Sequence, residues 1–146
     1  VGPEKKAYTL HKALLVHHSG YFRGALSGDW VEAKEGTIHL EDVHTGAFNI
    51  FVNWIYAGQL PTSPRSGEFA PHDPEEFPGC SFAIGRLRAY ILADMLIVPS
   101  LKDALFDIEY KWYSVLQPPR VKVAIFAFEN LPATDPFLQL LVDSYC

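Results

Sequence analysis

The chain has 146 residues, of which 49% are hydrophobic and 20% are charged. This length and this balance predict about one globular domain with its own core, and they exclude a disordered chain. The formal net charge is −5, and the basic residues are scattered along the sequence. Binding to a nucleic-acid backbone or to a membrane surface is therefore not expected.

The two cysteines, Cys80 and Cys146, do not form a disulfide framework, which favours a reducing compartment. No apolar run is long enough for a transmembrane helix, and no signal peptide is recognisable. The chain starts at Val1 rather than at Met, so we expect it to be a fragment of a longer protein.

The N-terminal part predicts a short strand followed by two short helices. Ala7–Leu10 alternates between apolar and polar side chains, as a half-buried strand does. Helical spacing then predicts Lys12–His18 and Gly20–Leu26 as helices, with Ser19 as the N-cap of the second.

The next part predicts a second strand and a longer helix. Thr37–Leu40 alternates and contains β-branched residues. Thr45 is then expected to cap a helix whose apolar stripe includes Phe48 and Phe51, and Gly58 fits the left-handed position just past its end.

The segment Pro61–Gly79 changes character, because prolines, glycines, serines and acidic residues dominate it. We interpret it as a loop or disordered insertion, with a solvated insertion favoured over a binding loop.

Four further helices are expected after this insertion. Apolar spacing predicts Phe82–Leu96, ended by Pro99, and a capping box at Ser100 and Asp103 then opens a helix that reaches Trp112. The last two helices are predicted at Val121–Glu129 and Pro136–Ser144. The fold class that follows is α+β, mostly helical with a small β-sheet.

No pattern in the sequence indicates catalysis or a cofactor. Nucleophile, phosphate-binding and dinucleotide-binding motifs are missing, and the histidines lack the spacing of a zinc site. The paired carboxylates Glu41-Asp42 and Glu75-Glu76 lie at a turn and in the insertion. We therefore predict that the chain is not an enzyme and binds neither a metal nor a cofactor. His11, where a strand meets a helix, is expected to be a buried residue that ties this turn together.

Several short segments occur in the order typical of one family. They are Tyr8–Leu15, Ser19–Arg23, Ile38–Val43, Trp54–Gly58 and Tyr90–Leu96. Taken together over about residues 7–113, they resemble BTB/POZ domains. The ending at 136–143 also resembles the short BTB proteins of filamentous fungi.

The resemblance implies a BTB/POZ fold over residues 1–117, including the Pro-rich insertion 61–79, and a C-terminal helical extension over 118–146. It implies a protein–protein interaction module without catalytic residues, whose partner is another copy, as in a homodimer, or a cullin scaffold. Members of the family serve as ubiquitin-ligase adaptors, and an apolar-x-Glu motif helps them to dock the cullin. Trp30-Val31-Glu32 occupies that place here, and Tyr56 matches a tyrosine near the same docking surface.

Alternatives remain open beside this interpretation. Trp30 either anchors a partner or folds back on the core with Glu32 merely solvated. A second function is a transcription-linked oligomerisation module that recruits co-repressor peptides in a dimer groove near His17, His18 and Arg23. The family's first strand is mostly missing, which argues against a strand-swapped dimer. The implied location is the nucleus, the cytoplasm or both.

Overall fold

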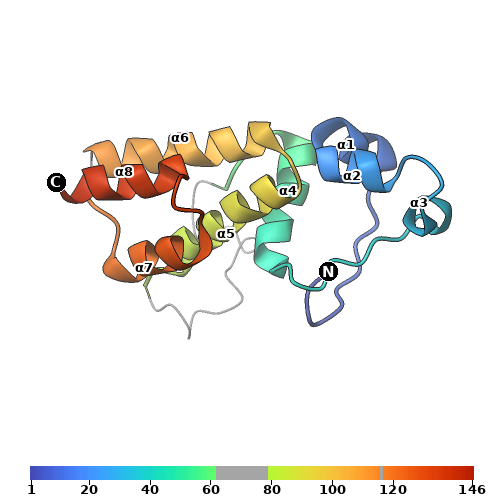
Figure 1. Ribbon diagram of the computed structural model, residues 1–146, viewed down its shortest axis with the longest axis horizontal. Coiled ribbons are helices and arrows are strands. Elements are labelled where there is room, and N and C mark those ends of the chain that lie inside the picture. Colours follow the sequence, from blue (N-terminus) through green and yellow to red (C-terminus); the bar gives the residue numbers. More distant parts are fainter. Residues whose placement is uncertain (62–78, 116) are drawn as a thin grey trace.

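The computed structural model describes residues 1–61, 79–115 and 117–146. Within these ranges the chain forms eight helices and no strand. The first four helices are α1 (Lys12–His18), α2 (Gly20–Ala25), α3 (Val31–Glu35) and α4 (Thr45–Ala57). They are followed by α5 (Ser81–Met95), α6 (Pro99–Val115), α7 (Val121–Asn130) and α8 (Pro136–Tyr145). Figure 1 shows an elongated molecule with α1–α3 at one end, α5–α8 at the other and α4 between them.

Aromatic side chains join the N-terminal helices to α4. The ring of Phe22 from α2 stacks on Phe51 of α4, with ring centroids 6.0 Å apart. Tyr8 packs edge-on against Phe48 at 4.8 Å. On its other side α4 packs against α5, which contacts α6 and α7 in turn. A single core cluster therefore runs from α1 to α8.

The seven helices predicted from apolar spacing are confirmed, with ends that differ by only a few residues. Ser19 caps α2 as predicted, since its hydroxyl accepts a hydrogen bond from the backbone N–H of Phe22. Gly58 has φ 64°, the left-handed conformation expected at a helix end. Pro136 is the first residue of α8. Periodicity and capping chemistry account for these agreements.

Two predicted helix starts are wrong in detail. Thr45 is the first residue of α4, and the cap is His44, whose Nδ1 accepts from the N–H of Gly46. The helix α6 begins at Pro99, so Ser100 lies inside it instead of capping it. Proline is favoured at a first helical position because its missing N–H would have no partner there.

The small β-sheet is not confirmed, and the fold that the structure describes is helical. Ala7–Leu10 and Thr37–Leu40 do alternate between exposed and more buried side chains, as predicted. Among the described residues, however, no backbone hydrogen bond joins the two segments, and Leu40 accepts instead from Gly2. Alternation of side chains is necessary for a strand, but a sheet requires a paired backbone.

The helices of the predicted C-terminal extension pack on the same body as the rest. The hydroxyl of Tyr90 in α5 donates to Asp135, the residue that caps α8, at 2.8 Å. The predicted boundary at residue 117 falls between α6 and α7 and stays a prediction. The predicted Pro-rich insertion, 61–79, lies almost entirely outside the described residues.

Candidate partner-binding surface

The short helix α3 stands apart from the helical body at one end of the molecule (Figure 1). It has five residues, and none of them is buried. Gly36 ends it with φ 64°, a conformation that glycine adopts without strain. This helix was not predicted from the sequence, since a single exposed turn has no apolar period.

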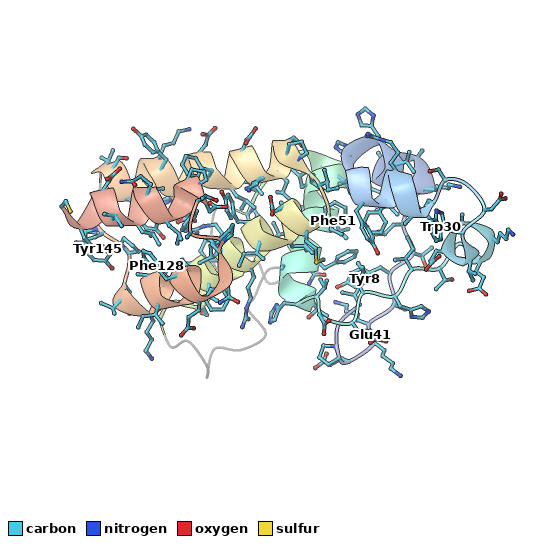
Figure 2. The ribbon with its side chains drawn as sticks, in the orientation of Figure 1. Tyr8, Trp30, Glu41, Phe51, Phe128 and Tyr145 are labelled. Atoms are coloured by element: carbon cyan, nitrogen blue, oxygen red, sulfur yellow. The ribbon has the colours of Figure 1, made fainter. Side chains whose placement is uncertain are left out.

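Trp30 and Val31 at the start of α3 point away from the core. Their side chains are 68% and 62% exposed. The alternative in which Trp30 folds back on the core is therefore wrong, and Figure 2 shows this residue at the α3 end of the molecule. Glu32 is also exposed and lies in the first turn of α3, where a carboxylate is favoured by the helix dipole.

Tyr56, the third predicted site residue, lies near the end of α4 and is half-exposed. Its hydroxyl accepts from the backbone N–H of His11 at 2.9 Å and is 2.7 Å from Nδ1 of the same histidine. His11 does tie the turn before α1 together, but it is exposed rather than buried as predicted. Among the described residues, no hydrogen bond or ring contact links Tyr56 to Trp30 or Glu32. The structure thus brings Trp30 and Glu32 together and leaves Tyr56 on another element.

The α1–α2 corner carries the residues of the alternative function. The rings of His17 and His18 lie edge to face at 4.8 Å. Partial burial and the neighbouring His17 lower the pKa of His18 below its usual value. Arg23 donates to the carbonyls of Val16 and His17, so its guanidinium is engaged at the end of α1.

A hollow of about 730 Å³ lies between α1–α2 and the two segments that were expected to be strands. Its apolar wall includes Leu15, Phe22 and Phe48, and Tyr8 lines it as well. The hydroxyl of Tyr8 is fixed by Asn49 at 2.6 Å. Figure 2 shows Tyr8 and Glu41 on this side of the molecule. The hollow could not be predicted from the sequence, because its lining comes from segments that are far apart along the chain.

Other classes of site find little support in the part of the chain that the structure describes. It contains no group of three or more His, Cys, Asp or Glu side chains that could hold a metal ion. No helix there is long and apolar enough to cross a membrane. Cys80 is buried and Cys146 exposed, and both are free thiols.

Comparison with known families gives a match in the N-terminal part of the chain. The BTB/POZ domain family model matches residues 2–70. The BTB/POZ match includes α1–α4, and with them Trp30, Glu32 and Tyr56. The BTB/POZ domain is a protein–protein interaction module and is not typically catalytic. The wider resemblance, through α5 and α6, stays a prediction. No solved structure matches the chain.

Proposed function

We propose that the chain is a protein–protein interaction module that forms homo- or hetero-oligomers and binds a partner through α3. One observation carries this proposal: Trp30 and Val31 are exposed side by side on a helix that buries nothing. Tryptophan is enriched among the residues that dominate binding energy, and an apolar anchor beside charged residues fits a partner-binding surface. The family match over residues 2–70 supports the same function.

A more specific proposal makes the chain an adaptor for a cullin-type ubiquitin ligase. Its support is the apolar-x-Glu pattern of Trp30-Val31-Glu32, whose anchor and carboxylate are both exposed in the structure. In this proposal Trp30 fills an apolar pocket on the cullin and Glu32 pairs with a basic group at the rim. Tyr56 contributes its exposed ring, while its hydroxyl stays bonded to His11.

The second candidate is a transcription-linked module that recruits co-repressor peptides at α1–α2. It has less support, because Arg23 already donates to two carbonyls of its own chain. Light scattering separates the candidates, since a groove between two copies requires a dimer. A fungal source and a nuclear or cytoplasmic location belong to the proposal as well.

The test is a titration of the purified chain with the N-terminal domain of a cullin from the same organism. Trp30→Ala is expected to weaken binding by about 2 kcal/mol, roughly thirtyfold in Kd, because it truncates the anchor. Glu32→Ala is expected to cost less, as a rim charge does. Neither change should lower the melting temperature, since neither side chain is buried.

Two control variants match these changes. Trp112→Ala removes a tryptophan of α6 that is also more than half exposed, and Glu35→Ala removes a carboxylate from the other end of α3. Both should leave the affinity unchanged. Absence of binding by the unaltered chain would refute the cullin proposal. If the chain instead captures a different protein from the native proteome, and Trp30→Ala abolishes this capture, the broader proposal of partner binding through α3 stands.

A further inference from the structure

The outer face of α7 carries an apolar stripe that no other described helix covers. Val121, Ile125 and Phe128 are each more than half exposed, although they follow the helical spacing of a packed face. Ala124 completes the stripe and is partly exposed. The opposite side of α7 places Val123 and Ala127 in the core. The helix is therefore apolar on two sides, but only one of them is packed.

A hollow of about 390 Å³ lies beside this stripe, between α7 and the end of α8. Ala124 lies in its lining, together with Ile125, Phe128 and Tyr145. Figure 2 shows Phe128 and Tyr145 near each other at one end of the molecule. The hydroxyl of Tyr145 donates to the carbonyl of Pro119, which fixes the ring as a wall of the hollow. The hollow is thus preformed in the free chain.

We propose that this stripe is a self-association surface, on which α7 of a second copy packs antiparallel around a two-fold axis. The stripe is self-complementary about its midpoint. An antiparallel copy places Val121 opposite the partner's Phe128, and Ala124 opposite the partner's Ile125. The small Ala124 leaves space in the hollow for the larger side chain that faces it.

Charge at the edge of the stripe favours the same occupant. Lys122 and Glu129 are two helical turns apart and therefore lie along the same side of α7. Both are exposed, and neither makes an ion pair within the described parts of the chain. An antiparallel copy brings Lys122 toward the partner's Glu129, and symmetry repeats this pair. A parallel two-fold copy places the charged edges of the two helices on opposite sides of the interface, so it forms no such pair.

The inference rests on the oligomerisation in the proposed function and names a surface for it outside residues 2–70, whereas partner binding through α3 is tested separately by the cullin titration. The area of this surface is limited to one helix face and the end of α8. A standard interface buries roughly 800 Å² on each partner, so we expect a monomer–dimer equilibrium rather than a permanent dimer.

The test measures molar mass by light scattering and sedimentation over a range of concentrations of the whole chain. The unaltered chain should shift from monomer to dimer as its concentration rises. Ile125→Glu should raise the dimer Kd by roughly tenfold or more, because it places a charge at the centre of the interface. Its circular dichroism and melting temperature should stay unchanged, since Ile125 is exposed.

Charge reversal tests the antiparallel arrangement directly. Lys122→Glu and Glu129→Lys should each weaken the dimer several-fold, and the double variant should restore it. Tyr110→Glu is the matched control, because it adds the same charge at a similarly exposed residue on α6, and it should leave the mass unchanged. Val31→Glu tests α3, the proposed partner-binding helix, in the same assay.

Three outcomes would overturn the inference. They are a chain that is monomeric at every concentration, a dimer that Ile125→Glu leaves intact, and single charge reversals that the double variant does not rescue. Dissociation by Val31→Glu, with no effect of Ile125→Glu, would indicate that the chain self-associates through α3. That outcome would support the proposed function and refute the α7 interface.

Discussion

Ser19 is a small residue on which the junction between α1 and α2 depends. It is fully buried, and its hydroxyl makes two hydrogen bonds. It accepts from the N–H of Phe22 at 3.2 Å and donates to the carbonyl of Leu96 at 2.6 Å. The first bond caps α2, while the second ties the α1–α2 corner to the turn between α5 and α6.

We expect Ser19→Ala to lower the free energy of unfolding by about 2 kcal/mol. The change removes a helix cap and leaves the buried N–H of Phe22 without its acceptor, while the carbonyl of Leu96 keeps only the N–H of Tyr21. Urea unfolding measures the loss. Ser27→Ala is the control, because this hydroxyl also bonds to backbone carbonyls, of Arg23 and Gly24, but is exposed. Equal losses in the two variants would show that burial of the Ser19 bonds is irrelevant.

At the scale of elements, α5 and α6 are joined by an ion pair inside the core. Arg86 donates from Nε to Glu109, and both side chains are almost fully buried. The guanidinium also lies over the ring of Phe82, 4.7 Å from its centroid. Burial of two charges costs desolvation energy, so the intact pair adds little net stability. Removal of one partner is expected to lower the free energy of unfolding strongly, because the other charge stays buried alone.

Glu109→Leu should therefore lower the free energy of unfolding by about 3–5 kcal/mol, because it leaves the Arg86 charge uncompensated in the core. The double variant Arg86→Met/Glu109→Leu should recover much of this loss, and a double-mutant cycle in urea measures the coupling. Asp94→Ala is the control. It removes the exposed partner of Lys102 and should cost less than about 1 kcal/mol. If the double variant were as unstable as Glu109→Leu, the uncompensated charge of Arg86 would not be the cause of the loss.

Helices with an apolar residue at every third or fourth position were predictable from the sequence. Strand pairing and irregular turns were not. The helices α6 and α8 bury a continuous side, so their spacing is visible in the sequence. Residues 7–10 have the alternation of a strand, but pairing depends on which backbone lies beside them. Ile97 has φ 54°, which a β-branched residue rarely adopts, and its carbonyl accepts from Gly20. Tertiary contacts hold this turn, so local propensity could not predict it.

The same division applies to the candidate site. Trp30 and Glu32 lie together at the start of α3 because they are two residues apart in the sequence, and their role in binding stays a prediction. Their relation to Tyr56 depends on how α3 lies relative to α4, which no spacing in the sequence specifies. The α7 surface was missed for a related reason: its helix was predicted, but the periodicity cannot say which of two apolar sides is packed.

At the scale of the whole molecule, two tyrosines of the C-terminal helices, Tyr90 and Tyr113, couple the stability of the fold to pH. Burial, followed by the hydrogen bond to Asp135 and nearby acidic charges, raises the pKa of Tyr90 far above its usual value. Burial and then the charge of Glu109 raise the pKa of Tyr113 in the same direction. The folded chain therefore keeps both phenolic protons at pH values where the unfolded chain releases them.

The sign of the effect follows from these protons. Tyrosines of an unfolded chain ionise near pH 10, so above that pH the unfolded state binds fewer protons than the folded state. The stabilisation is complete below pH 10 and is lost as the pH rises, by up to about 1.4 kcal/mol per pH unit for each proton. Urea unfolding from pH 8 to 11.5 measures the slope, and tyrosinate absorbance reports the ionisation. Tyr113→Phe removes one of the two protons and should flatten the slope above pH 10 without changing it below. A slope that is the same in both proteins would show that Tyr113 ionises freely in the folded state, and that the joint between α5 and α6 is open to solvent.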